Sequence, residues 1–238
     1  MTDPGPGTPP AGGWRTAVVT VVAHPGPRSV RVRLRVPDRV DHRAGQHYVL
    51  RLTAEDGYTA ARSYSVASPP SDPELELFVE RLDNGEVSSF LADVVEVGDE
   101  LEVRGPIGGW FVWDGTSPAL GIGGGTGVVP LVAMLRHARA TGRSELLRLA
   151  VSARTLEDLP YADELIDAGA VLALSRAASA GRPAGRLLAA DLQPLIEPAA
   201  TAFVCGSGAF AEALSSELVE LGMPVGSIRV ERFGPSGA

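Results

Sequence analysis

The sequence predicts two folded parts: an N-terminal six-stranded antiparallel Greek-key β-barrel, followed by a Rossmann-like parallel sheet flanked by helices. Three observations support this prediction. The chain has 238 residues, more than a single hydrophobic core usually serves. Residues 14–114 contain short segments of alternating apolar and polar residues. Residues 115–238 instead alternate apolar runs with helical segments. Residues 1–13 precede both parts and form a Pro/Gly-rich tail that we expect to be disordered.

The period of two in the first part is clearest at residues 30–36, where apolar residues at even positions alternate with arginines at odd positions. Residues 47–52, 74–80 and 100–103 show similar strand patterns, and turn sequences such as EDG and DNG separate them. About six strands at this spacing are typical of a small antiparallel barrel. One short helix is expected near residues 88–95.

Apolar runs and helical segments alternate after Gly115. The expected strands are 119–122, 146–151, 171–174 and 202–205, and the expected helices are 129–140, 162–168 and 209–221. Strand–helix alternation with short loops is typical of a parallel sheet with helices on both faces. The boundary between the two parts is expected at residues 114–118.

Composition argues against several classes of protein. The net charge of −8 disfavours nucleic acid and anionic membranes as partners. No run of some 18 apolar residues is present and the N-terminus lacks a signal-peptide pattern, so we expect a cytoplasmic protein without a membrane partner. The single cysteine, Cys205, excludes an internal disulfide and a four-thiolate iron–sulfur cluster. The histidines are scattered without ligand spacing, so we predict no metal site and expect each to be structural or exposed; they are His24, His42, His47 and His137.

The stretch GIGGGTGVVP, residues 121–130, joins a predicted strand to a predicted helix. Backbone N–H groups at Gly125, Thr126 and Gly127 could approach a pyrophosphate there, at the positive end of the helix dipole. Tight strand–helix packing would require glycines equally, so both interpretations stay open. The spacing differs from G-x-G-x-x-G, and we therefore expect a related but different nucleotide-binding turn.

The second strand of this half ends in AVSARTLEDLPY. A carboxylate usually binds the ribose 2′-hydroxyl of NAD at this point. Here Ser152, Arg154 and Tyr161 offer hydroxyls and a cation, which suit a 2′-phosphate, so NADPH is favoured and NADH remains possible. A solvated loop arginine is the alternative, and Glu157 and Asp158 weaken the inference.

The stretch RSYSVAS, residues 62–68, lies within a predicted barrel strand. Because side chains alternate along a strand, Arg62 and Tyr64 share a face. Arginine matches phosphate geometry and a tyrosine ring can lie against a flat heterocycle, so the pair suits a flavin nucleotide. Taken alone, these seven residues are better explained by a cross-strand Arg–Glu pair beside a half-buried tyrosine.

Five motifs follow one another along the chain: RSYS, GEVSSFL, GPIGGWF, GGGTGVVP and VCGS. This series resembles the ferredoxin–NADP reductase superfamily, in particular its short FAD-dependent members without a fused ferredoxin domain. The resemblance covers residues 14–238. It implies that residues 14–114 form an FAD-binding β-barrel domain and residues 115–238 an NAD(P)-binding α/β domain.

The resemblance also implies roles for individual residues. Arg62 would bind FAD phosphate, Tyr64 would pack on the flavin, and Ser65 would hydrogen-bond its reactive N5 edge. Cys205 would lie beside the nicotinamide, although a buried structural cysteine is the alternative. The catalytic set is thus Tyr64, Ser65 and Cys205. Further cofactor contacts are expected at Ser63, Val66, Ser68, Gly85, Val87, Ser88, Ser89, Gly206 and Phe233, with Gly105, Pro106 and Gly108 resembling a hinge between the domains.

The implied activity is that of an enzyme, a flavoprotein oxidoreductase. It would take a hydride from NADPH onto bound FAD and pass electrons to a separate ferredoxin-like, haem or molybdenum protein. A flavin reductase that releases reduced flavin, and a non-catalytic electron-relay subunit, are the alternatives. An excess of arginine between residues 28 and 62 could dock an acidic partner. The same arginine row at residues 31–35 could instead pair with glutamates at residues 74–80 across the sheet.

Overall fold

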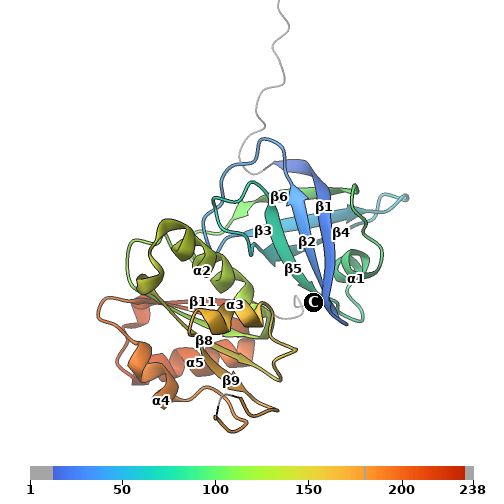
Figure 1. Cartoon of the computed structure of the whole chain (residues 1–238). Helices are drawn as coiled ribbons and strands as arrows, with labels where there is room; N and C mark the ends of the chain where they lie inside the picture. The colour runs from blue at the N-terminus through green and yellow to red at the C-terminus, as the bar shows by residue number, and fades with distance from the viewer. Residues whose placement is uncertain (1–12, 180, 234–238) are drawn as a thin grey trace, which may run out of the picture.

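Two β-sheets organise the described residues, 13–179 and 181–233, of this computed structural model (Figure 1). The predicted N-terminal tail falls outside these residues except for Gly13. The first sheet is antiparallel and lies at the upper right of Figure 1, and the second is parallel and lies at the lower left. The predicted fold class is therefore confirmed.

The antiparallel sheet has the strand order β4-β3-β6-β1-β2-β5. Its strands are β1 (Trp14–Gly26), β2 (Ser29–Arg35), β3 (His47–Thr53), β4 (Thr59–Ser65), β5 (Leu75–Glu80) and β6 (Glu100–Ile107). An isolated bridge between Val66 and Leu77 links the end of β4 to β5, so the sheet is barrel-like without a continuous closing ladder. Helix α1 (Glu86–Asp93) buries Val87 and Leu91 against the barrel core.

The arginine row of β2 shows how the barrel's surface is neutralised. Arg33 lies 2.8 Å from Asp72 and 3.2 Å from Glu74, and Arg35 lies 3.5 Å from Glu74. The predicted alternative, pairing across the sheet, is therefore found for these two arginines. Arg33 and Arg35 are engaged within the barrel and do not form a free basic surface for an acidic partner.

The parallel sheet has the strand order β11-β10-β7-β8-β9. Its strands are β7 (Ala119–Gly124), β8 (Leu147–Ala153), β9 (Val171–Leu174), β10 (Thr201–Ser207) and β11 (Ile228–Phe233). Helices α2 (Val129–Thr141) and α3 (Ala162–Asp167) cover one face, whereas α4 (Ala189–Leu192) and α5 (Gly208–Glu220) cover the other. Among its described residues this half also has four short 3₁₀ turns: η1 (Gly125–Val128), η2 (Ser144–Leu146), η3 (Gln193–Leu195) and η4 (Val225–Ser227).

The boundaries of α2 follow from local sequence. Pro130 stands in its first turn, where the missing N–H costs nothing. Gly142 ends the helix in the left-handed conformation, with φ of 65°. The predicted helices at 129–140, 162–168 and 209–221 are found within two residues of their expected ends. Strand β11 and the single-turn helix α4 were not predicted.

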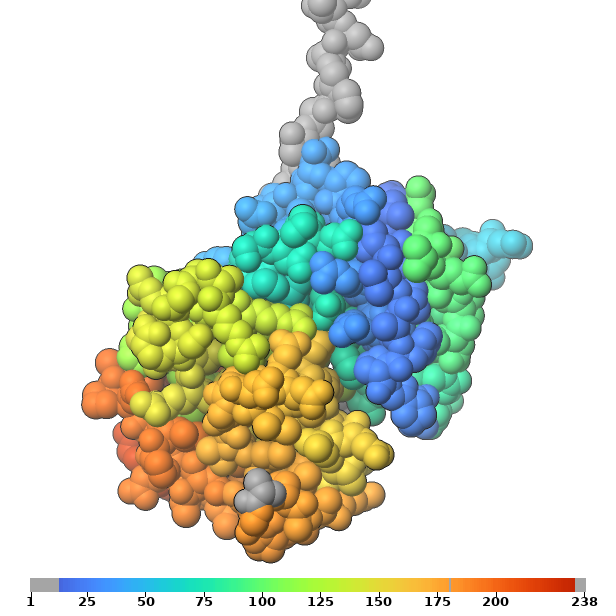
Figure 2. All heavy atoms as spheres, viewed as in Figure 1, coloured from blue at the N-terminus to red at the C-terminus, as the bar shows by residue number. Residues whose placement is uncertain are grey.

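The two sheets meet through packed side chains and polar contacts. Ala44, just before β3, and Phe111, in the connection between the sheets, pack with Met134 of α2. Arg229 of β11 donates to the carbonyl oxygens of Trp110 and Val112 at 3.1 and 3.0 Å. In Figure 2 the atoms of the two halves lie directly against each other. Within the described residues, no helix has the length and apolar character needed to cross a membrane.

Candidate functional site

Strand β4 places Arg62 and Tyr64 on one face, as predicted. Arg62 stands opposite Leu50, and Tyr64 stands opposite Tyr48, and both partners on β3 are buried in the barrel core. The exposed Arg62 guanidinium donates to the carbonyl oxygen of Ala61 at 2.7 Å, and among the described residues no carboxylate pairs with it. The Arg–Glu alternative is therefore not found for Arg62, whose charge remains available to an anion. Burial raises the pKa of Tyr64, so its hydroxyl stays protonated.

Ser65 is the last residue of β4 and is buried. Its Oγ atom has no hydrogen-bond partner among the described residues. A buried hydroxyl left unpaired is costly, so this atom is well suited to bind a polar ligand atom. His47 of β3 stands directly opposite Ser65, and burial lowers the pKa of its imidazole. From the sequence, His47 was expected only to be structural or exposed; the strand register places it beside the predicted catalytic serine.

The residues after Ser65 are buried and make hydrogen bonds within the protein. Val66 and Ser68 are fully buried, and the Ser68 hydroxyl donates to the carbonyl oxygen of Glu74 and accepts from the amide of Glu76, both at 3.0 Å. These contacts fix the segment that extends the RSYS motif. Flavin contacts by Val66, Ser68 and the exposed Ser63 stay predictions.

The start of helix α1 is an open backbone terminus. Gly85 precedes the helix and provides no side-chain cap, and a Cβ atom at this position would lie 2.3 Å from the Ser88 Oγ atom. The hydroxyls of Ser88 and Ser89 donate to the carbonyl oxygens of Gly85 and Leu82 at 3.1 and 3.2 Å, and so brace the turn. Their direct contact with a pyrophosphate stays a prediction, as does that of the buried Val87.

Helix α1 lies beside strand β4. The Tyr58 hydroxyl, just before β4, donates to the Glu86 carboxylate at 3.0 Å. This bond brings the positive end of the α1 dipole to the strand that carries Arg62. A helix terminus and an unpaired arginine together suit a diphosphate.

The glycine-rich turn after β7 serves two purposes. A Cβ atom at Gly127 would lie 2.3 Å from the Cys205 carbonyl oxygen, so tight packing requires glycine there. Gly125 has φ of 54°, a Cβ atom there would meet no other atom within 4 Å, and Thr126 is half-buried. The packing interpretation therefore holds for Gly127, while Gly125 and Thr126 leave an accessible backbone at the carboxyl end of the sheet.

Two arginines lie at neighbouring strand ends. Arg154 follows β8 and Arg176 follows β9, and the Arg176 amide donates to the Arg154 carbonyl oxygen at 2.8 Å. Both side chains are exposed, and Ser152 is half-buried on β8. The Asp158 carboxylate accepts from the amide and hydroxyl of Thr155 at 3.1 and 2.7 Å, so local bonds engage it. Arg176 was not predicted, although the SR sequence at a strand end is the signal that could have identified it.

Tyr161 lies between the two sheets. Its hydroxyl donates to the Glu76 carboxylate of β5 at 2.9 Å, and its ring centroid lies 5.6 Å from that of Phe78. Burial and the nearby Glu76 charge raise the pKa of the phenol. Its predicted contact with a nicotinamide nucleotide stays a prediction, and in this structure the hydroxyl is already engaged.

Cys205 and Glu231 are neighbours at the carboxyl end of the parallel sheet. Strand register pairs Cys205 with Glu231 of β11. Burial raises the pKa of the Cys205 thiol, so the sulfur is a protonated thiol at neutral pH. Burial also raises the pKa of the Glu231 carboxyl, to about 7. Glu231 was not predicted from the sequence; the available signal is a polar residue within an otherwise apolar strand end, and such a shift is typical of functional sites.

Gly206 and Phe233 complete this edge of the sheet. A Cβ atom at Gly206 would lie 2.6 Å from the Phe210 ring, so the aromatic side chain packs on the bare backbone. Phe233 is half-buried, pairs with Ser207 in register, and packs with the apolar cluster on the α2 face. Its stacking on a flavin stays a prediction.

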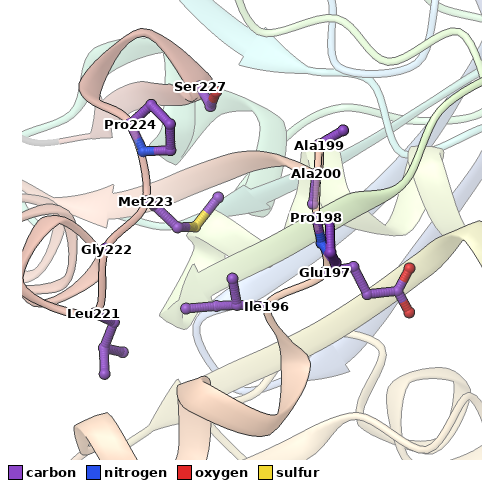
Figure 3. A pocket seen from close by; sticks show the side chains of 10 residues that line it. All are labelled: Ile196, Glu197, Pro198, Ala199, Ala200, Leu221, Gly222, Met223, Pro224 and Ser227. Atoms are coloured by element: carbon purple, nitrogen blue, oxygen red, sulfur yellow. The ribbon is translucent and has the colours of Figure 1, made fainter.

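A hollow lies at the opposite end of the parallel sheet. A cavity of about 310 Å³ is bordered by residues that precede β10 and residues that follow α5, including Ile196, Ala199 and Met223 (Figure 3). Ligands of open α/β sheets bind at the carboxyl ends of the strands. The cavity is therefore not the nucleotide site.

Comparison with known proteins agrees with this geometry. Residues 21–112 match the model of the oxidoreductase FAD-binding domain family. The chain is 30% identical over 220 residues to the ferredoxin–NAD(P)(+) reductase component of naphthalene 1,2-dioxygenase/salicylate 5-hydroxylase systems of a Ralstonia species. That match covers 87% of this chain and 65% of the relative, so the chain spans less than two thirds of that protein's length.

Solved structures show the same fold. A cytochrome P450 reductase from Amycolatopsis is 28% identical with a TM-score of 0.78, and the match covers 95% of this chain and 72% of that one. A ferredoxin NADP⁺ reductase from Neisseria gonorrhoeae, with bound FAD and NADP, gives a TM-score of 0.80 at 19% identity and covers 92% and 98% of the two chains. The fold, the match of residues 21–112 to the FAD-binding family and the unpartnered Ser65 hydroxyl are consistent with one another.

Proposed function

We propose that this chain, which matches the oxidoreductase FAD-binding domain family over residues 21–112, is a member of the ferredoxin–NADP reductase superfamily. It would act as an FAD-dependent NAD(P)H oxidoreductase that passes electrons to a separate redox protein. The observation that best supports the proposal is the buried Ser65 hydroxyl, which lacks a partner among the described residues in the domain that matches the FAD-binding family. When bound, FAD would accept a hydride from the nicotinamide and return the electrons one at a time.

The residues of this chain would bind and orient the two cofactors. Arg62 and the start of α1 would hold the FAD diphosphate, Tyr64 would cover the ring system, and Ser65 would hydrogen-bond its N5 edge. Cys205 would lie against the nicotinamide as a small protonated thiol. Proximity and orientation account for the rate, because the reacting groups belong to the cofactors.

NADPH is the proposed nicotinamide substrate. Arg154 carries an exposed cation at the carboxyl end of β8, and Arg176 adds a second cation at the adjacent strand end. Two guanidinium groups with hydroxyls nearby suit the dianionic 2′-phosphate that distinguishes NADPH from NADH. Glu157 is exposed and Asp158 is engaged by Thr155, so neither neutralises the pair through a described ion pair.

The electron acceptor is proposed to be a separate protein with a haem or iron–sulfur centre. The names of the relatives support this assignment, because the Ralstonia protein is a reductase component and the Amycolatopsis protein is a cytochrome P450 reductase. The single free cysteine is compatible with a reducing compartment, and we place the reaction in the cytoplasm.

Anaerobic stopped-flow mixing tests the proposal. The purified protein is expected to retain FAD and to lose its 450 nm absorbance when NADPH is added, more slowly with NADH. Re-oxidation by a ferredoxin or a P450 haem protein, at substoichiometric reductase, would identify the acceptor class. A protein whose flavin is bleached by neither nucleotide would be a relay subunit, and one that releases its reduced flavin on gel filtration would be a flavin reductase.

A further inference from the structure

A buried carboxylate, that of Glu76, takes part in the contact between the two halves of the chain. Glu76 of β5 is 4% exposed although it lies on the outward face of the barrel. Three groups approach it: Arg136 Nη1 at 2.9 Å, the Tyr161 hydroxyl at 2.9 Å and Arg33 Nη1 at 3.5 Å. Arg136 and Tyr161 belong to the parallel-sheet half, so Glu76 joins the two halves.

Arg136 makes further polar contacts, whereas the nearby Arg31 has a buried Nε atom without a hydrogen-bond partner among the described residues. Arg136 donates to Glu164 at 2.9 Å and to the Ala67 carbonyl oxygen at 3.2 Å, and its guanidinium lies 4.8 Å from the centre of the Tyr161 ring. The carboxylates raise the pKa of Arg136 despite its burial, and Arg136 lowers the pKa of Glu164. Arg136 is thus paired with one carboxylate from each half, and paired charges help a buried polar cluster to hold one arrangement.

Arg136, Tyr161 and Ala67, which take part in this cluster, each belong to or adjoin a segment of the proposed nucleotide sites. Arg136 lies on α2, the helix that follows the glycine-rich turn. Tyr161 ends the loop that begins at Arg154. Ala67, whose carbonyl oxygen binds Arg136, follows Ser65 by two residues. Directly or through Arg136, Glu76 therefore connects three segments: the residues that follow Ser65, helix α2, and the loop from Arg154 to Tyr161.

The backbone at Tyr161 is itself strained. Its φ of 56° is in the left-handed region, which a bulky residue rarely adopts. Such conformations persist where the surroundings enforce them, and they concentrate at functional sites. The bond to Glu76 and the stacked Arg136 provide that enforcement here.

We propose that Glu76 is a positioning residue that sets the alignment of the nicotinamide pocket on the flavin pocket. The inference rests on the proposed function. It assigns to Glu76 no contact with either cofactor. Displacements of about 1 Å between reacting groups lower rates by about 10²-fold, so loosening this contact should slow the reaction between correctly bound cofactors.

The test compares Glu76→Gln, Tyr161→Phe and the double variant with wild type. The matched control is Glu102→Gln, which removes the partner of Arg51 in a pair of 2.6 Å on the barrel surface. Three quantities are measured: FAD content, the NADPH dissociation constant, and the limiting rate of flavin bleaching at saturating NADPH. We expect Glu76→Gln to retain FAD and lower the limiting rate about 10–100-fold, with less than a threefold change in the dissociation constant. Tyr161→Phe should lower that rate about threefold or more, the double variant should be no slower than Glu76→Gln, and the control should be unchanged.

Hydrogen exchange in the flavin-free protein supplies a readout independent of turnover. We expect faster exchange in Glu76→Gln at the amides of residues 134–138 and 159–165, and unchanged exchange in the control. A lower melting temperature with an unaltered limiting rate would overturn the proposal, because Glu76 would then serve stability alone. If Glu76→Gln does not fold, an unchanged limiting rate in Tyr161→Phe overturns it as well. A wild-type protein that neither nucleotide reduces would refute the proposed function, whereas the exchange comparison would still show whether Glu76 holds the two segments.

Discussion

Glu231→Gln should stabilise the protein above neutral pH, with no gain in acid. The pKa of the Glu231 carboxyl is raised to about 7 by burial, against an ordinary value of 4.5. Below pH 4.5 the group is protonated whether the chain is folded or unfolded. Between pH 4.5 and 7 the unfolded chain loses the proton and the folded chain keeps it. Stability from this group is therefore fully present below pH 4.5 and is lost as pH rises through 7.

The size of the effect follows from the pKa difference. At about 1.36 kcal/mol per pKa unit, the interval from 4.5 to about 7 corresponds to about 3 kcal/mol. Glutamine has nearly the same shape and cannot ionise, so the variant escapes this loss. The free energy of unfolding of the variant should therefore be nearly equal to that of wild type at pH 4.5 and about 3 kcal/mol higher at pH 8.

Urea unfolding of the flavin-free protein, followed by circular dichroism at pH 4.5, 6 and 8, measures this difference. Glu212→Gln, on the exposed surface of α5, is the control and should give a flat difference across the same range. Carbon-13 labelling of the glutamate carboxyls would report the Glu231 titration directly. A pH-independent difference between Glu231→Gln and wild type would refute the reasoning, since it would mean that Glu231 titrates alike in the folded and unfolded chains.

Three further changes test individual site residues. Arg62→Ala should weaken FAD binding about 10–100-fold in an FAD titration, since a charge-assisted hydrogen bond is worth about 1.5–3 kcal/mol. The control Arg28→Ala should leave FAD binding unchanged. Stoichiometric FAD in purified Arg62→Ala would contradict the phosphate role of Arg62. Arg154→Ala should raise the NADPH Michaelis constant about tenfold with little effect on NADH, and equal effects on both nucleotides would contradict the 2′-phosphate assignment. Gly127→Ala should lower the free energy of unfolding by about 1–3 kcal/mol, because its Cβ atom would lie 2.3 Å from the Cys205 carbonyl oxygen. Gly226→Ala is the control, since a Cβ atom there would meet no other atom within 4 Å. Equal denaturant midpoints for these two glycine variants would argue against the packing role.

The elements that could be predicted from the sequence are those governed by local rules. Alternation of valine and arginine predicted β2, and its apolar side is fully buried. Pro130 and Gly142 lie at the two ends of α2 because their backbone preferences apply whatever the surroundings. Strand β11 escaped prediction because Glu231 and Arg232 interrupt its apolar pattern, and its pairing with β10 decides its conformation.

The parts of the site that could not be predicted depend on contacts between distant segments. Alternation placed Glu76 on an outward face, but it is buried in contact with Arg136 of α2 and with Tyr161. Tyr161 was predicted to contact a nucleotide from its position after a strand, and its partner Glu76 is 85 residues away in the chain. The pairing of His47 with Ser65 likewise depends on strand register, which no single segment of the sequence specifies.

The burial of Cys205 has a consequence for the lifetime of the protein. Peroxide attacks thiolates that solvent can reach, and reduced flavins generate peroxide when dioxygen intercepts them. The Cys205 sulfur is fully buried and stays protonated, so two requirements for oxidation are missing. In the proposed function this sulfur atom would lie near a flavin that generates oxidant, and we expect repeated cycles in air to leave it unmodified.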